Sequence, residues 1–302
     1  MIRNFDDLLA AVSNMPKKRI VIASPEGGEV IKLVRAALEQ KVADFVLVGD
    51  RERIASMAHF EGFDCKDVEI IHRTVHKDAA EEAVGLVVAG KANAIMKGNL
   101  PTSTFLKAIL DKQKGLNNNT IISEVTLHEK IEGEGLQLIT DCAINISPTL
   151  DEKVQIVNNA VQMAHRLGYQ RPRVAVLSAV EVVNPAIPDT LDAAVLSKMS
   201  ERGQIKGCII DGPFALDNAV SLEAARYKNL DGEVAGRADI ILAPNLQVGN
   251  PLHKALVFFA RRKIASAVLG ARAPIVMTSR SDSMETMLLT IALAAYISPA
   301  PE

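Results

Sequence analysis

A short stretch near the C-terminus has the residue types that could hold an anion. Residues 274–283 read PIVMTSRSDS, and an almost wholly apolar segment follows them. This pattern predicts a buried strand, a hydroxyl-rich turn with one arginine, and a helix that begins directly after the turn. Backbone N–H groups and the positive end of the helix dipole would then lie near Arg280, an arrangement that suits phosphate. The alternative is a well-capped helix start with Arg280 in solvent.

A second candidate group follows another predicted strand. Lys97 and Gly98 come directly after Met96, and Thr102 and Ser103 open the next predicted helix. Open α/β sheets bind ligands at the carboxyl ends of their strands, so these residues are candidates for substrate binding. The alternative for Lys97 is a solvated surface lysine.

A third group lies after the predicted strand 240–242. Asn250 and Lys254 are four residues apart, with His253 between them, on a predicted helix. That spacing would place Asn250 and Lys254 on one helix face. The alternative for Asn250 is a helix N-cap.

The cysteines and histidines give no metal-binding pattern. Cys65, Cys142 and Cys208 are odd in number and far apart, and His72 and His76 lack the residues of an H-E-x-x-H motif. We therefore expect no disulfide framework, no zinc cluster and no metal site, and a reducing cytoplasm fits this cysteine usage.

The composition excludes several classes of protein. The chain has 302 residues, is 48% hydrophobic and carries a net charge of −2, and its 34 basic residues are scattered. Such a chain can bury a sizeable core but shows no nucleic-acid footprint. The apolar run 287–297 is shorter than the roughly 20 residues that span a bilayer, so we expect a core or subunit-interface helix there. The first residues lack the layout of a signal peptide.

Short apolar runs alternate with helical patterns along the whole chain. The predicted strands are 19–23, 45–48, 68–71, 94–96, 120–122, 174–177, 208–210, 240–242, 266–269 and 275–277. The clearest predicted helices are 29–41, 78–89, 103–111, 150–167 and 252–262, and 133–135 is typical of a hairpin turn. This alternation predicts an α/β fold with a mostly parallel sheet covered on both faces.

The stretch 145–149 is the best candidate for a domain boundary. Pro148 disfavours helix at the preceding residue, and Thr149 with Glu152 forms a capping box for the next helix. We expect a first α/β/α domain of residues 1–145 plus 270–302, and a second of 146–269. The final strand and helix would then place the Ser-Arg turn in a cleft between the domains.

Taken in order, these motifs resemble those of the phosphate acetyltransferase/phosphate butyryltransferase family. The resemblance covers residues 19–297, and the ordered series is more specific than any one motif. It is carried by FVLVGD at 45–50, MKG at 96–98, TDCAIN at 140–145, DGP at 211–213, VAGRAD at 234–239, APN at 243–245, GN at 249–250 and TSR at 278–280. The segments at 96–98, 255–260 and 278–280 are more similar to the butyryl branch.

The resemblance implies two α/β/α domains with an interdomain cleft, a fold shared with isocitrate and isopropylmalate dehydrogenases. It implies reversible acyl transfer between coenzyme A and inorganic phosphate, with phosphate butyryltransferase favoured over phosphate acetyltransferase. The partners would be acyl-CoA and phosphate, with coenzyme A as a substrate, no bound cofactor or metal, and no nucleic-acid or membrane partner. A cytoplasmic homodimer, or an assembly of dimers, is the expected form.

The resemblance also implies roles for individual residues. Ser279 and Arg280 match the family's serine-arginine pair, so Arg280 would bind phosphate and stabilise charge while Ser279 donates to the oxyanion. The implied substrate-binding residues are Lys97, Gly98, Thr102, Ser103, Asn145, Asn250, Lys254, Ser281 and Ser283.

The chain departs from the family at the catalytic base. The acetyl branch carries an aspartate seven residues after the serine, where this chain has Thr286. Glu285 or Asp282 would substitute, or a thiol with a pKa of about 8.5 would ionise unaided. More distant alternatives are an NAD- and metal-dependent dehydrogenase of related fold, which needs a set of clustered aspartates that is not evident, and a non-catalytic CoA-ester sensor.

Overall fold

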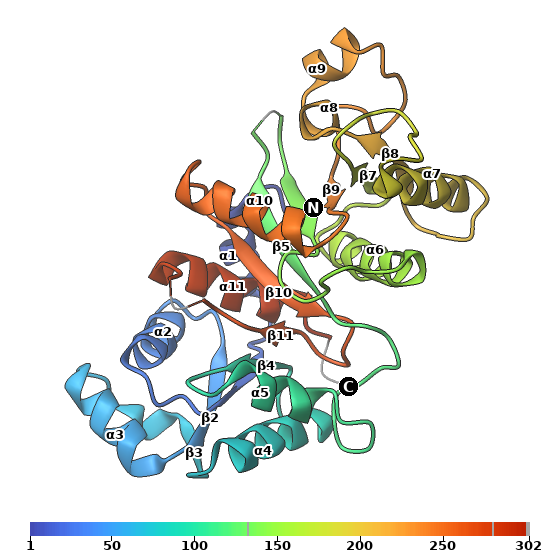
Figure 1. Ribbon diagram of the computed structural model, residues 1–302. Helices are drawn as coiled ribbons and strands as arrows, with labels where there is room; N and C mark the ends of the chain where they lie inside the picture. The colour runs from blue at the N-terminus through green and yellow to red at the C-terminus, as the bar shows by residue number, and fades with distance from the viewer. Residues whose placement is uncertain (132, 280, 300–302) are drawn as a thin grey trace. The chain divides into compact units, whose positions relative to one another are not determined.

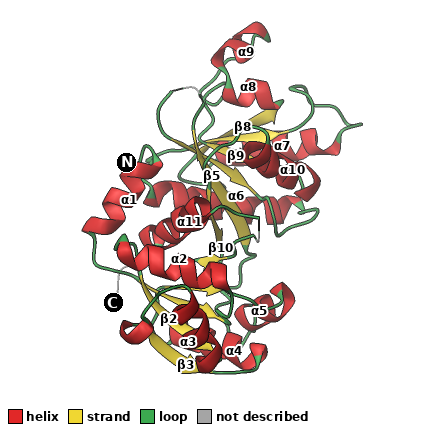
Figure 2. Cartoon of the chain, turned by 90° about the vertical axis from the view of Figure 1, so that its left-hand side faces the viewer, coloured by secondary structure: helices red, strands yellow, loops and turns green. Residues whose placement is uncertain are grey.

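The computed structural model describes residues 1–131, 133–279 and 281–299. The chain divides into two compact units, each with its own internal contacts. Unit 1 comprises Met1–Asn4 and Ile121–Ile264, and unit 2 comprises Phe5–Thr120 and Ala265–Glu302. In each unit, strands form a sheet that helices cover (Figures 1 and 2). The predicted α/β fold class is confirmed.

The strands of unit 2 form a mostly parallel arrangement in the order β3-β2-β1-β4-β11-β10. All neighbours are parallel except β10 and β11. Every residue of β1 after Arg19 is buried, as a sheet covered on both faces requires. The strand bounds are β1 Arg19–Ala23, β2 Asp44–Gly49, β3 Glu69–His72, β4 Ala94–Lys97, β10 Ala265–Leu269 and β11 Ile275–Val276.

The helices of unit 2 form two groups that cover the two faces of its sheet (Figure 1). One group contains α4 and α5, which pack against each other, and the other contains α1, α11, α2 and α3, which pack in that succession. Their bounds are α1 Phe5–Asn14, α2 Gly28–Glu39, α3 Arg51–Phe60, α4 His76–Val88, α5 Thr102–Ile109 and α11 Met284–Ile297, with a 3₁₀ turn at Cys65–Asp67.

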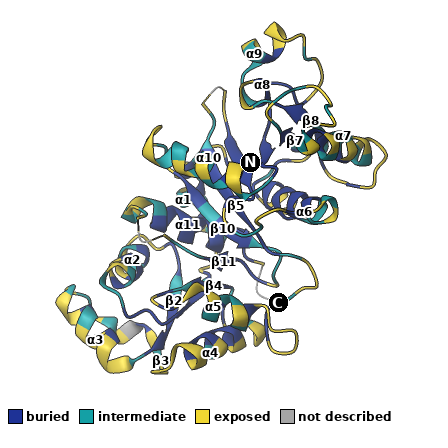
Figure 3. Ribbon diagram, viewed as in Figure 1, coloured by how far each residue is buried: buried dark blue, intermediate teal, exposed yellow. Residues whose placement is uncertain are grey.

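Helix α11 corresponds to the long apolar run of the sequence. Its residues from Met287 to Ala295 are all buried, and it contacts α1, α2, β10 and β11 (Figure 3). A helix that is apolar all round belongs in a core, so its hydrophobicity is explained within unit 2 and needs no second subunit. Among the residues that the structure describes, no helix has the length and apolarity to cross a membrane.

The strands of unit 1 follow the order β5-β6-β9-β7-β8. β5 and β6 are antiparallel, and the other neighbours are parallel. The turn between β5 and β6 contains Gly133 and Gly135, both with positive φ, so the predicted hairpin turn is confirmed. The strand bounds are β5 Ser123–Glu129, β6 Leu136–Thr140, β7 Arg173–Leu177, β8 Ile209–Phe214 and β9 Ile240–Leu242.

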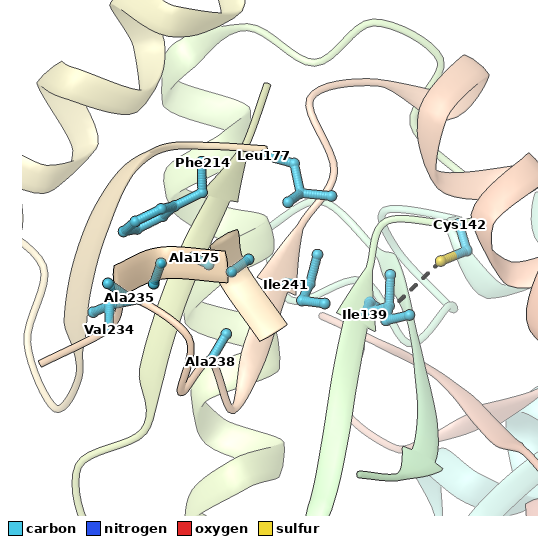
Figure 4. Packing of buried hydrophobic residues seen from close by; sticks show 11 residues of the cluster. Ile139, Cys142, Ala175, Leu177, Phe214, Val234, Ala235, Ala238 and Ile241 are labelled. Atoms are coloured by element: carbon cyan, nitrogen blue, oxygen red, sulfur yellow. Dashed lines mark hydrogen bonds between the residues drawn. The ribbon is translucent and has the colours of Figure 1, made fainter. Parts of the chain in front are cut away.

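The helices of unit 1 enclose an apolar core. Thr149 and Glu152 form the predicted capping box at the start of α6, and Gly168, with φ of 99°, follows the end of that helix. Figure 4 shows the cluster that β6, β7, β8 and β9 share with the α8–α9 region and the 234–238 loop. The helix bounds are α6 Leu150–Arg166, α7 Pro188–Glu201, α8 Leu216–Val220, α9 Leu222–Tyr227 and α10 Leu246–Phe258.

The division between the units differs from the expected boundaries at residues 145 and 269. β6 pairs with β9 through Leu138 and Ile240, and β5 pairs with β6, so the chain enters unit 1 already at Ile121. β10 pairs with β11 through Val268 and Ile275, so the return to unit 2 begins at Ala265. Strand pairing between segments far apart in sequence therefore sets both boundaries. The final strand and helix lie in the unit that contains β1 to β4.

Candidate functional site

In unit 2, three turns leave the sheet at one edge. The parallel registers place Ala23 beside Lys97 and Met96 beside Val276, so β1, β4 and β11 end at the same level. Helices α2, α5 and α11 follow these three turns. The arrangement gathers the N-termini of three helices along one edge, and the N-cap residues of α2 and α5 make no side-chain capping bond, which suits this edge to binding an anion.

The turn between β11 and α11 is held by its own side chains. The backbone N–H of Ser279 donates to Asp282 Oδ2 at 2.7 Å, and the hydroxyls of Ser279 and Ser281 are 2.9 Å apart. Ser283 is the N-cap of α11 and accepts from the N–H of Thr286 at 3.1 Å. The predicted succession of strand, hydroxyl-rich turn and helix is confirmed.

The three candidates nearest this turn differ in their surroundings. Arg280 lies outside the described residues. The Asp282 carboxylate accepts from the backbone of Ser279, so it serves to shape the turn. Glu285 is exposed in the first turn of α11.

Lys97 is held along the turn that follows β4. Its Nζ donates to the carbonyl oxygens of Gly98 and Leu100, both at 3.2 Å, and the residue is half-buried. Lys97 is therefore partly shielded from solvent and bonded to its own turn. Gly98 packs so closely on β1 that a Cβ there would lie 2.2 Å from the carbonyl oxygen of Ser24, and only glycine fits.

Thr102 and Ser103 lie exposed in the first turn of α5. The N-cap of that helix is Pro101, which makes no side-chain capping bond. The N-cap residue therefore makes no bond to the first backbone N–H groups of α5, and the hydroxyls of Thr102 and Ser103 lie beside those groups.

The turn after β1 belongs to the same edge. Asn99 Nδ2 donates to the carbonyl oxygen of Glu26 at 3.1 Å, which ties this turn to the Lys97 turn. Glu26 is buried and its Oε1 accepts from the N–H of Asp50. No sequence motif indicates either contact, because both join segments far apart in the chain.

In unit 1, Asn145 ends a tightly bonded turn after β6. The Asp141 carboxylate accepts from the backbone N–H groups of Ala143, Ile144 and Asn145 at 2.9 to 3.2 Å. Asn145 Nδ2 donates to Asp141 Oδ2 and to the carbonyl oxygen of Ile122. The amide nitrogen of Asn145 therefore has a structural role.

Helix α10 contacts this turn through its first residues. Its N-cap is Asn245, which accepts from the N–H of Val248 at 3.1 Å, so the alternative of Asn250 as the cap is wrong. Asn250 Nδ2 donates instead to the carbonyl oxygen of Cys142 at 3.0 Å. A Cβ on Gly249 would lie 2.1 Å from the carbonyl oxygen of Asp141, so the backbones touch. Lys254, one turn further along α10, is exposed.

Sequence reasoning missed one group of ligand-type side chains in unit 1. Glu124 on β5, Cys142 after β6 and His253 on α10 each place a ligand atom within 4.8 Å of the others. No local motif links them, because the pairing of β5 with β6 and the packing of α10 bring them together.

The comparison with known proteins decides the family. Residues 64–295 match the family model described as phosphate acetyl/butaryl transferase. This chain belongs to that family. The family that the ordered motifs resemble is therefore confirmed.

Individual relatives of the family align over nearly the whole chain. A phosphate butyryltransferase of Clostridium acetobutylicum is 46% identical over 297 residues, covering 98% of this chain and 99% of that protein. A phosphate acetyltransferase of Thermotoga maritima is 40% identical over 291 residues, covering 96% of this chain and 99% of that protein. The crystal structure of a branched-chain phosphotransacylase from Enterococcus faecalis is 32% identical, has a TM-score of 0.81, and covers 93% of this chain and 98% of that one.

Proposed function

We propose that this protein is a phosphate acyltransferase that moves a short-chain acyl group between coenzyme A and inorganic phosphate, with a butyryl group preferred. The near full-length similarity to a phosphate butyryltransferase carries this proposal. The helix N-termini at the edge of unit 2 support it, because they suit a phosphate substrate.

The reaction needs no covalent enzyme intermediate. A phosphate oxygen attacks the thioester carbonyl carbon, a tetrahedral intermediate forms, and the C–S bond breaks to release the CoA thiolate. In the reverse direction the thiolate attacks the acyl phosphate and phosphate leaves. In both directions negative charge develops on the carbonyl oxygen, so the protein's main task is to fix donors where that charge appears. Holding both substrates in reacting geometry supplies the remaining acceleration.

We assign the charge-stabilising roles to the turn before α11. Arg280 binds the phosphate and offsets its charge, and Ser279 donates from its hydroxyl to the oxyanion. Ser281 and Ser283 flank this pair, and Ser281 lies within hydrogen-bond distance of the Ser279 hydroxyl. Asp282 holds the backbone of Ser279 in place. Ser279 is thus positioned by the turn itself before any substrate binds.

The adjoining turn of unit 2 supplies further donors for substrate. Lys97 brings a positive charge to the end of β4, next to β11 in the sheet. Gly98 permits the close packing of that turn against β1. Thr102 and Ser103 offer hydroxyls at the open N-terminus of α5. Together they suit the oxygens of a phosphate group.

In unit 1, we assign Asn145, Asn250 and Lys254 to substrate binding. The amide nitrogens of Asn145 and Asn250 donate to the protein backbone, so we assign their amide oxygens to the ligand. Lys254 is exposed and suits the phosphates of coenzyme A.

Glu285 is the proposed base for the CoA thiol. It is exposed in the first turn of α11, whereas the Asp282 carboxylate is occupied with the backbone of its own turn. Thr286, where the acetyl branch has aspartate, has its N–H bonded to the N-cap Ser283. Greater exposure to solvent is the observation that favours Glu285 over the half-buried Asp282.

The cytoplasmic location, the homodimeric state and the use of coenzyme A without a resident cofactor are further parts of this proposal. The cytoplasmic location is proposed from the cysteine usage, and the other two come from the family resemblance. The apolar residues of α11 lend the dimer no support, because that helix packs within unit 2.

The test is release of free CoA thiol by the purified protein from acetyl-, propionyl-, butyryl- and isobutyryl-CoA, with and without phosphate. We expect release only with phosphate, and fastest with butyryl- or isobutyryl-CoA. Fastest release from acetyl-CoA would make the protein a phosphate acetyltransferase. Absence of release from all four substrates would overturn the transferase assignment.

A further inference from the structure

Three side chains in unit 1 form a compact group of metal-ligand type. Glu124 lies on β5, Cys142 in the turn after β6, and His253 on α10, and we call them the Glu-Cys-His group. One ligand atom from each lies within 4.8 Å of those of the other two. Glu124 and Cys142 are buried and His253 is half-buried. We propose that the Glu-Cys-His group binds a zinc ion.

The donor set suits zinc better than the hard cations. Zinc accepts sulfur, imidazole nitrogen and carboxylate oxygen in one tetrahedral site, and three protein ligands leave a fourth position for water. A thiolate disfavours Mg²⁺ and Ca²⁺, which prefer oxygen ligands alone. One sulfur, one nitrogen and one oxygen ligand therefore point to zinc.

The scaffold fixes the ligands in place. The Cys142 carbonyl oxygen accepts from Asn250 Nδ2 at 3.0 Å, which ties the cysteine to α10 one turn before His253. Thr126, two residues after Glu124 on β5, has its Oγ1 3.0 Å from His253 Nδ1 and orients the imidazole ring. Such outer contacts hold metal ligands in position and strengthen metal binding.

The cysteine side chain itself lies at one side of the unit 1 core. Its Sγ lies 3.8 Å from the carbonyl oxygen of Ile139. The dashed line in Figure 4 marks this contact, which a weak S–H donor makes and a metal bond would replace. The neighbouring Asp141 carboxylate accepts from four N–H-bearing groups of its own turn and from the N–H of Glu124, so it does not join the group as a ligand.

The surroundings of Cys142 and His253 shift the pKa values of both side chains. Burial raises the pKa of the Cys142 thiol well above its usual range, and the Glu124 and Asp141 carboxylates raise it further, so zinc must displace the thiol proton. Burial lowers the pKa of His253, and the positive charge of Lys254 lowers it further. A positive ion also compensates the negative charges that surround the thiol.

The test measures metal binding directly, independently of catalysis. Chelator-treated full-length protein is titrated with Zn²⁺ against a chromophoric chelator, and with Co²⁺ while thiolate-to-cobalt charge-transfer absorption is recorded. We expect one tight site per chain with that absorption. The variant Cys65→Ser/Cys208→Ser, in which Cys142 is the only cysteine left, should keep both signals.

Two ligand variants complete the test. Cys142→Ser and His253→Tyr should each weaken zinc binding at least about 100-fold, beyond the loss expected for an outer contact. Cys208→Ser is the matched control, because Cys208 is also a buried cysteine of unit 1. Circular dichroism checks that each variant folds. The proposal is overturned if the wild-type protein binds no zinc at micromolar concentrations, if the variant retaining Cys142 loses the absorption, or if His253→Tyr binds zinc as the wild type does.

Discussion

Among single residues, Arg280 should have the largest effect on the reaction. It is the guanidinium that we assign to phosphate binding and charge stabilisation, so Arg280→Ala should lower turnover at least about 100-fold, as the loss of one preorganised donor does. Steady-state rates of CoA release measure the effect. Arg272→Ala is the control, because Arg272 is an exposed arginine just before β11. A near-normal rate for Arg280→Ala would remove Arg280 from the mechanism.

The role of Glu285 should be visible in the pH dependence of acyl-phosphate consumption. At pH 6 almost no CoA thiol is ionised, whereas at pH 9 a thiol with a pKa of about 8.5 ionises without a base. Glu285→Gln should therefore slow the reaction more at pH 6 than at pH 9. The measurement is the ratio of variant to wild-type rates at the two pH values. A ratio that does not change with pH would reject Glu285 as the base.

His128 should make the stability of the protein depend on pH. Burial in β5 lowers the pKa of His128 below its ordinary value of about 6.5, and the charge of Arg262 lowers it further. The unfolded chain then binds more protons than the folded one below about pH 6.5, so stability is present above that pH and is lost as the pH falls.

Urea unfolding at about pH 7.5 and about pH 5.5 measures this contribution. His128→Gln should lose less stability over that interval than the wild type, because it removes one titrating group from the balance. His59→Gln on α3 is the control, since His59 is exposed. An unchanged pH dependence in His128→Gln would show that His128 does not contribute.

At the scale of secondary structure, the contact of α10 with the turn after β6 should be sensitive to a single methyl group. Gly249→Ala would place a Cβ 2.1 Å from the carbonyl oxygen of Asp141, whereas Gly85→Ala in α4 meets no atom within 4 Å. Both glycines are helical, so intrinsic propensity favours alanine at each by about 1 kcal/mol.

Urea unfolding should separate the two substitutions. Gly85→Ala should raise the free energy of unfolding by about 0.5–1 kcal/mol, and Gly249→Ala should lower it by about 1–3 kcal/mol, because backbone must move to relieve the overlap. Equal effects of the two substitutions would mean that α10 does not pack closely on the Asp141 turn.

Most elements could be predicted from local patterns, and the exceptions have identifiable causes. Continuous apolar runs gave β1 and β9 with the bounds that the structure has. β6 was not predicted because Gln137 interrupts its short apolar pattern and Thr140 ends it. Both are buried in the strand, where Gln137 donates to the carbonyl oxygen of Ala238 and Thr140 to that of Glu124. Polar residues with distant partners leave no local signal.

In the candidate site, too, features with a local sequence signal were predictable and features that depend on the folded geometry were not. The turn before α11 was predictable because its strand, its hydroxyls and its N-cap Ser283 are adjacent in sequence. Sequence spacing does not predict that Asp282 bonds to the backbone of Ser279. It also does not predict that Glu124 and His253 lie close together in the folded chain. The sequence therefore identifies candidate residues, and the structure separates those that shape a turn from those that can meet a substrate.

At the scale of the whole molecule, the central claim is transfer of the acyl group to phosphate. The most direct measurement counts acyl phosphate, trapped with hydroxylamine, against free CoA thiol during the reaction of butyryl-CoA with phosphate. The account predicts equal amounts of the two products and none of either without phosphate. Thiol release with butyrate in place of acyl phosphate would show that water is the acceptor, and would contradict the account.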